Sequence, residues 1–159
     1  MKLYLVQHAE AKSKGEEPTR PLTDKGVGDA SNMAAFLKAA GVRVDEVAHS
    51  GKLRADQTAR ALGRAVWPDE PVVVMEGLGP NDGTDHVLHA AQAAGGDLMV
   101  VGYMPFMARM AARCLTGSED GLSVAFEPGS VLCLERTEDG WVLHWMMRPS
   151  NWPPTEVFN

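Results

Sequence analysis

The sequence contains few cysteines and no long apolar run, and these absences already exclude several protein classes. Its two cysteines, Cys114 and Cys133, form no CxxC pair and have apolar neighbours. They indicate buried free thiols rather than a disulfide or a metal site. No apolar stretch approaches the roughly 20 residues of a membrane helix, and no secretory leader pattern precedes the first apolar segment. We therefore expect a cytoplasmic protein with no membrane partner.

The sequence also has fewer cationic than acidic residues. The chain has 15 lysines and arginines against 21 acidic residues, for a formal net charge of −6. Such a balance argues against general affinity for nucleic acid. Any phosphate or similar anion that the protein binds must therefore be met by a local basic pocket. Since 45% of the 159 residues are hydrophobic, we expect one folded domain spanning residues 1–159.

Short apolar segments alternate with helical periodicity along most of the chain, a pattern typical of an α/β protein. The expected strands that alternate with helices cover residues 3–6, 44–49, 71–75 and 98–101. Residues 130–136 and 141–147 flank Glu138-Asp139-Gly140 and predict a hairpin. We expect a three-layer α/β/α fold with a mostly parallel central sheet, helices on both faces and the C-terminal hairpin at the sheet edge.

Turn and capping signals mark where the predicted helices begin. Thr23 and Thr84 are expected N-caps, and Pro105 suits a first helical position because that position needs no N–H. The apolar face expected for the helix after Thr23 consists of Val27, Ala30, Met33, Ala34 and Leu37. The apolar face expected for the next helix consists of Ala55, Ala59, Leu62 and Val66.

Two strand-to-helix junctions place polar side chains where ligands bind in α/β sheets. His8 follows the first buried strand, and Tyr103 follows the segment 98–101 in an equivalent position. His8 either faces a cleft or merely caps its strand. Arg54 lies in the first turn of a predicted helix, where a cation opposes the helix dipole unless an anion is bound. The alternative is a surface arginine paired with Asp56 or another acid.

Metal ligands are not indicated by the histidine pattern. His86 and His89 are one helical turn apart, but no further histidine, cysteine or acid completes a recognisable ligand set. We therefore interpret both as surface histidines.

Several stretches taken together resemble a known family. They are residues 5–11, Arg20-Pro21-Leu22-Thr23 with Gly26, residues 50–59 with their Arg-Ala-x-Gln-Thr core, residues 100–105, and Pro128-Gly129-Ser130 at the hairpin entry. In order and spacing they resemble the phosphoglycerate mutase-like histidine phosphatase superfamily, and within it the SixA-type phosphohistidine phosphatase branch. The match extends over nearly the whole chain and is therefore more specific than any single motif.

The resemblance implies a role for each matching residue. It makes His8 the nucleophile that attacks phosphorus and becomes transiently phosphorylated, a task suited to a neutral imidazole. It makes Arg54 the arginine that grips the phosphoryl oxygens, and Arg20 a residue that lines the same pocket or braces it. It implies no metal and no organic cofactor. The implied substrate is a phosphorylated histidine-containing protein in signal transduction.

Two pocket positions depart from the family pattern. The family has arginine where this chain has Gln7, and histidine where it has Tyr103. Both side chains can donate a neutral hydrogen bond, but neither supplies positive charge. Losing one preorganised donor costs about 3 to 4 kcal/mol of transition-state stabilisation. Lys52 and His49 are candidates for replacing the lost positive charge. Alternatively, Lys52 is a solvated surface residue and His49 is packed at the end of its strand.

These features leave two functional hypotheses. The first is a metal-independent phosphohistidine phosphatase that works through a phospho-His8 intermediate. The second is a catalytically degenerate relative that binds a phosphorylated group or a protein partner through His8 and Arg54. Hydrolysis of a small phosphomonoester is a third possibility, which the absence of long lid-forming insertions disfavours.

Overall fold

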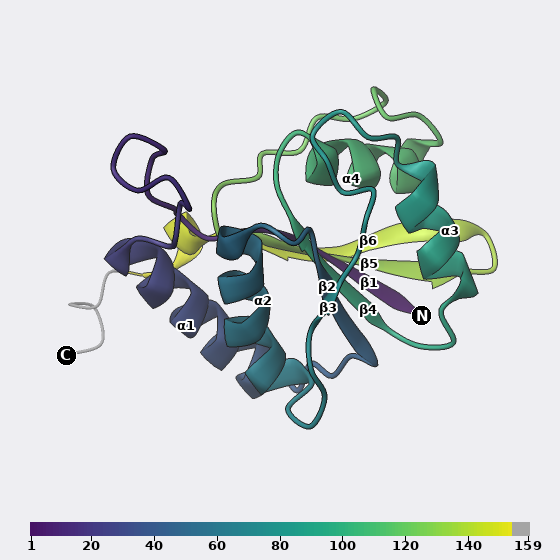
Figure 1. Cartoon of the computed structure of the whole chain (residues 1–159). Coiled ribbons are helices and arrows are strands. Elements are labelled where there is room, and N and C mark those ends of the chain that lie inside the picture. The colour runs from purple at the N-terminus through teal and green to yellow at the C-terminus, as the bar shows by residue number, and fades with distance from the viewer. Residues whose placement is uncertain (154–159) are drawn as a thin grey trace.

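The computed structural model describes residues 1–153, in which a six-stranded sheet lies between two pairs of helices (Figure 1). The strands are β1 (Lys2–Gln7), β2 (Glu46–His49), β3 (Val73–Val74), β4 (Leu98–Gly102), β5 (Val131–Thr137) and β6 (Gly140–Met147). The helices are α1 (Asp24–Ala39), α2 (Leu53–Val66), α3 (Asp85–Ala93), α4 (Phe106–Thr116) and the 3-10 turn η1 (Pro149–Asn151). The predicted three-layer α/β/α fold is confirmed.

Strand β1 lies inside the sheet, whose order is β3-β2-β4-β1-β5-β6. It pairs in parallel with β4 on one side and antiparallel with β5 on the other. The hairpin β5–β6 therefore extends one edge of the sheet, as the sequence predicts. Gln7 lies opposite Gly102 in the β1–β4 register. The two strands therefore end side by side, and the residues that follow them begin at the same edge.

The apolar run of β1 is continuous because the strand is covered on both faces. Leu3 and Leu5 pack in the core with α3 and α4, whereas Tyr4 and Val6 pack in the core with α1 and α2. All four side chains are buried. Alternate side chains of one strand thus anchor it to both helix layers, which fixes the position of the residues at its carboxyl end.

Helix α1 begins where the sequence predicts, but its buried face differs by one position. Thr23 is the N-cap, and its Oγ1 accepts a hydrogen bond from the Gly26 N–H at 3.0 Å. Val27, predicted to be buried, is 55% exposed, and Gly26 is buried instead. A Cβ added to Gly26 would lie 2.1 Å from the carbonyl oxygen of Glu10. The helix therefore packs its glycine against the backbone that follows β1, and this turns Val27 outward.

The predicted strand 71–75 is mostly wrong, because only Val73 and Val74 form β3. Both are exposed, at 37% and 63%. β3 lies at the edge of the sheet and pairs only with β2. An apolar run alone does not distinguish such an edge segment from a strand buried in the sheet.

Two predicted helix starts also differ in detail. Pro105 is the N-cap of α4 rather than its first helical residue. Thr84 is the N-cap of α3, but its side chain makes no capping bond. Its hydroxyl donates instead to Glu119 Oε1 at 2.7 Å, which ties the start of α3 to the segment after α4.

The prediction of buried free thiols holds fully for Cys133 and in part for Cys114. Cys133 is buried, Cys114 is half-buried, and both are free thiols. Burial raises the pKa of the Cys114 thiol to about 12. In the described residues 1–153, no helix has the length and apolar character needed to cross a membrane.

Candidate anion-binding active site

His8 is fixed at the carboxyl end of β1 by backbone and side-chain hydrogen bonds. Its backbone N–H donates to the Gly102 carbonyl at 2.8 Å, and only 8% of the residue is exposed. Its Nδ1 lies 2.7 Å from the carbonyl oxygen of Ala9. Since a carbonyl only accepts, Nδ1 carries the proton of this hydrogen bond. In the neutral ring the lone pair is therefore on Nε2.

The surroundings of His8 favour that neutral ring. Burial lowers the pKa of His8 below the ordinary histidine value, and the nearby Arg54 and Arg20 guanidinium groups lower it further, while the Ala9 carbonyl acts in the opposite direction. A neutral imidazole held by its other nitrogen is the form that acts as a nucleophile.

Arg54 joins His8 to the start of α2. Its Nε donates to His8 Nε2 at 3.3 Å, and its guanidinium lies 5.4 Å from the centre of the Tyr103 ring. The alternative pairing with Asp56 is wrong, because Asp56 contacts Arg60 at 2.9 Å and His49 at 3.3 Å. No carboxylate within residues 1–153 lies within ion-pair distance of Arg54. Its charge is thus left for a ligand.

Arg20 approaches the same region from the loop that follows β1. Among residues 1–153 it is the one non-glycine residue with positive φ, at 51°. Its Nε donates to the Lys12 carbonyl at 3.0 Å. Arg20 and Arg54 line a common pocket of about 500 Å³, and each lies close enough to His8 to lower its pKa. Arg54 therefore contacts the His8 imidazole, and Arg20 lies with Arg54 in a shared pocket, where its charge still acts on His8.

Gln7 and Tyr103 complete the predicted set without adding charge. The Gln7 backbone bonds with the hairpin entry: its N–H donates to Ser130, and its carbonyl accepts from Gly129. Its side-chain Oε1 is buried and has no hydrogen-bond partner among residues 1–153. Arg54 thus contacts both His8 and Tyr103, while Arg20 lies in the adjoining pocket and Gln7 precedes His8 in the chain.

Two residues of the Arg-Ala-x-Gln-Thr stretch support the site, and sequence reasoning missed them. Thr58 Oγ1 accepts from the Ala9 N–H at 3.0 Å and donates to the Arg54 carbonyl at 2.8 Å. Gln57 Oε1 accepts from the Leu22 N–H at 2.8 Å. Helix α2 therefore holds both the segment after His8 and the segment after Arg20. Their spacing in the sequence could have indicated this role, because residues three and four positions after Arg54 lie one helical turn further along the same face of α2.

His49 and Lys52, the candidates for replacing the positive charge that Gln7 and Tyr103 lack, have different surroundings. His49 is buried; its Nδ1 accepts from the Gly51 N–H at 3.1 Å and its Nε2 lies 3.3 Å from Asp56 Oδ1. It is a packed residue at a strand end. Lys52 is exposed and lines the pocket shared by Arg20 and Arg54.

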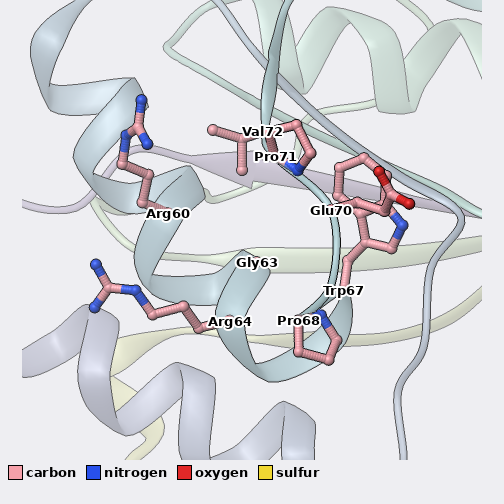
Figure 2. Close-up of a pocket in the computed structure, with 8 residues that line it drawn as sticks. All are labelled: Arg60, Gly63, Arg64, Trp67, Pro68, Glu70, Pro71 and Val72. Atoms are coloured by element: carbon pink, nitrogen blue, oxygen red, sulfur yellow. The ribbon is translucent and has the colours of Figure 1, made fainter.

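Other features of residues 1–153 lie apart from this site. No group of three or more histidine, cysteine or acidic residues converges there as metal ligands do, and His86 and His89 are exposed. Figure 2 shows another pocket, between α2 and the segment that follows it. Arg60, Arg64 and Glu70 contribute to it, but none of the predicted site residues does.

The chain is similar in sequence to known phosphatases. The family model described as histidine phosphatase superfamily (branch 1) matches residues 3–80. Over 156 residues, the chain is 25% identical to the phosphohistidine phosphatase SixA of Escherichia coli (strain K12), covering 95% of this chain and 96% of that protein.

Solved structures extend the likeness to the whole fold. A structure of the protein histidine phosphatase SixA complexed with tungstate has a TM-score of 0.83 and 24% identity, covering 95% of this chain and 99% of that one. The structure of the alpha-ribazole phosphatase from Shigella flexneri has a TM-score of 0.73 and 16% identity, covering 91% of this chain and 95% of that one. The fold is thus common to phosphatases with different substrates.

Proposed function

Because the chain is a member of the histidine phosphatase superfamily and resembles SixA, we propose that it removes phosphate from a phosphohistidine on a protein partner. The observation that carries this proposal is the state of His8. Its Nδ1 donates to the Ala9 carbonyl, and its unprotonated Nε2 faces the Arg54 guanidinium. This arrangement combines a nucleophile with a cation that stabilises the transferred group.

In the proposed first step, the lone pair of His8 Nε2 attacks phosphorus. The bond between phosphorus and the substrate imidazole nitrogen breaks, and that nitrogen takes up a proton from solvent as it leaves. In the second step, water attacks phosphorus, the bond to His8 Nε2 breaks, and the attacking water gives its proton back to solvent. The products are inorganic phosphate and free His8. Each step conserves the phosphoryl group, and neither requires oxidation or reduction.

The guanidinium groups of Arg54 and Arg20 would hold the phosphoryl oxygens. Their fixed forks of N–H donors match tetrahedral oxyanions, and phosphoryl transfer depends mainly on positioning and charge stabilisation. The related SixA bound to tungstate supports an anion site of this kind. Gln7 would add a neutral donor, and the Tyr103 ring would help to hold the Arg54 guanidinium in place. The free thiols Cys114 and Cys133 are in keeping with the cytoplasm as the proposed compartment.

A second candidate function is supported by one observation. Gln7 and Tyr103, which border His8 and Arg54, carry no formal positive charge. A pocket that keeps Arg54 and Arg20 but has fewer cations would still bind a phosphorylated group. We therefore retain a non-catalytic binding protein as the alternative.

The test compares wild type with His8→Ala and Arg54→Ala on a small protein phosphorylated at one histidine. Phosphate release, together with acid-labile phosphate trapped on wild type but not on His8→Ala in a rapid quench, supports the phosphatase. If folded wild type releases no phosphate but binds the phosphoprotein, and Arg54→Ala weakens that binding, the second function holds. If wild type shows neither release nor binding, both are contradicted.

A further inference from the structure

A basic pocket extends beyond the residues needed to hold one phosphoryl group. It lies between the loop after β1 and the start of α2, and its volume is about 500 Å³. Four of its eight lining residues are cationic, Lys14, Arg20, Lys52 and Arg54, and none is acidic. The protein as a whole has six more acids than cations. A pocket with only positive charge is therefore a local reversal of the protein's overall balance.

Other pockets of the described chain differ in this respect. The pocket at the far end of α2 is lined by Glu70 as well as by Arg60 and Arg64, which lie on the opposite side of it (Figure 2). The pocket beside Arg43 is of similar size, about 490 Å³, and is lined by four carboxylates. Both of those pockets thus have acidic as well as cationic residues in their lining, as is usual on a mixed surface.

The acids nearest in sequence to the basic pocket are already engaged. Glu17 forms an ion pair with Lys12 at 3.3 Å. Glu16 accepts from the Ser13 N–H at 3.2 Å. Within residues 1–153, neither Lys14 nor Lys52 has a carboxylate within ion-pair distance. Their charges are therefore not neutralised by the loop in which Lys14 lies.

Arg54 links this pocket to the chemistry at His8. It lines the pocket and also donates to His8 Nε2 at 3.3 Å. A group bound between Lys14 and Lys52 would therefore lie next to the phosphoryl position. Lys52 is also the N-cap of α2 and makes no side-chain capping bond, so the positive end of the helix dipole adds to its charge.

A phosphoryl group carries a charge of about −1.5 to −2, which Arg54 and Arg20 together balance. Two further lysines leave room for a second negative group. We propose that Lys14 and Lys52 are specificity residues that receive a carboxylate side chain of the protein partner, next to its phosphohistidine. This inference rests on the proposed function, since it deepens the assignment of the same site. It predicts that the preferred partner has Asp or Glu beside the phosphorylated histidine.

The test uses two fluorescent peptides that carry a non-hydrolysable triazolyl phosphonate analogue of phosphohistidine. One has Asp at the flanking positions, and the other has Asn. Two exposed ion pairs predict that wild type binds the Asp peptide about three- to tenfold more tightly in fluorescence anisotropy. Raising the salt concentration should reduce the preference, because the charges are exposed.

Lys14→Gln/Lys52→Gln should bring the ratio of the two dissociation constants close to one. The matched control, Lys38→Gln/Arg43→Gln, removes the same charge from exposed positions outside the pocket and should keep the wild-type ratio. An equal loss for both peptides in the pocket variant, or an equal loss of preference in the control, would overturn the inference. So would a wild type that binds neither peptide.

The outcome is separable from that of the proposed reaction. Binding of the analogue peptides requires no turnover. A wild type that prefers the Asp peptide but releases no phosphate from a true phosphohistidine would contradict the reaction and support the acidic preference. A wild type that releases phosphate equally well from both sequences would contradict the preference alone.

Discussion

Thr58 and Ala9 are joined by a buried hydrogen bond, in which the Ala9 N–H donates to Thr58 Oγ1 at 3.0 Å. The same hydroxyl donates to the Arg54 carbonyl. One side chain therefore connects the backbone beside the candidate nucleophile to the backbone of the candidate phosphate-binding arginine.

Replacing Thr58 with valine should destabilise the protein and loosen the site. Valine keeps the volume, but it leaves the buried Ala9 N–H without a partner, at a cost of about 1 to 3 kcal/mol. Chemical denaturation measures the change in unfolding free energy, and phosphate affinity reports on the site. Thr58→Ser keeps the hydroxyl and serves as the control. A valine variant with the stability and affinity of the serine variant would contradict the role of this hydroxyl.

Replacing Gly26 with alanine should push α1 away from the segment after β1. The added Cβ would lie 2.1 Å from the Glu10 carbonyl oxygen, and overpacking of this kind costs about 1 to 3 kcal/mol. Gly28, two residues along the same helix, has no atom within 4 Å of an added Cβ. There alanine should instead stabilise the protein by about 0.4 to 1 kcal/mol. Thermal unfolding of both variants checks the prediction, and shifts of the same sign would count against it.

Adding charge at position 7 should strengthen anion binding. Gln7→Arg places a guanidinium beside His8, and a charge-assisted hydrogen bond contributes about 1.5 to 3 kcal/mol. We expect tungstate or phosphate to bind roughly tenfold or more tightly in isothermal titration calorimetry. If the protein is a phosphatase, its turnover should rise as well. Gln7→Met, which has similar length and no charge, is the control, and unchanged affinity in Gln7→Arg would place residue 7 outside the anion site.

Tyr103 should support anion binding through the contact of its ring with the Arg54 guanidinium, and its hydroxyl should contribute little. Tyr103→Phe keeps a ring near the guanidinium, whereas Tyr103→Leu removes a cation–π contact that contributes about 0.5 to 1 kcal/mol. Anion affinity should therefore fall two- to fivefold in the leucine variant and change little in the phenylalanine variant. A larger loss in the phenylalanine variant would show that the hydroxyl itself binds the anion.

Protonation of His8 should set the acidic limit of both activity and stability. Its pKa is lowered in the fold, chiefly by burial, while the unfolded chain has the ordinary value of about 6.5. His8 therefore favours the folded state above about pH 6.5, and this contribution is lost as the pH falls from there through the lower folded-state pKa. Because its pKa is lowered, the His8 ring should also stay neutral, and able to act as a nucleophile, at pH values between the folded-state pKa and 6.5.

NMR titration of the His8 ring measures that pKa directly. Arg20→Gln should raise it, because the charge that helps to lower it is removed, and the acidic limb of the rate profile should move to higher pH by the same amount. A wild-type His8 pKa at or above 6.5 would contradict the assigned environment.

The fold was predictable from the sequence because burial on two faces leaves a strong pattern. Residues 3–6 of β1 and residues 98–101 of β4 are continuously apolar, and the apolar residues on the buried face of α2 recur at helical spacing. The errors arose where tertiary contacts override local pattern. Val27 has the right spacing for burial, but the close approach of Gly26 to Glu10 decides which face of α1 is inward. Val73 and Val74 are apolar, yet their edge position leaves them exposed.

The candidate site was predictable only in part for a related reason. The positions of His8, Arg54 and Tyr103 follow from strand ends and a helix start, which local sequence marks. The spacing of Thr58 four residues after Arg54 places both on one face of α2, but the contact of Thr58 with Ala9 spans 49 residues of chain, and the local sequence does not mark Ala9 as its partner. The tautomer of His8 depends on the direction of the Ala9 carbonyl, which the sequence does not fix. The grouping of Lys14 with Lys52 depends on the packing of the loop after β1 against the start of α2.

The place of β1 in the sheet also bears on how the protein opens when it fluctuates. β1 has a partner on each side and buried side chains, whereas the two-residue β3 has a partner on one side only and is exposed. In native-state hydrogen exchange, β1 amides should therefore exchange only through global unfolding, and β3 should exchange by local opening. The strand that carries His8 would then be among the last to lose its structure, so partly opened molecules keep the imidazole in place.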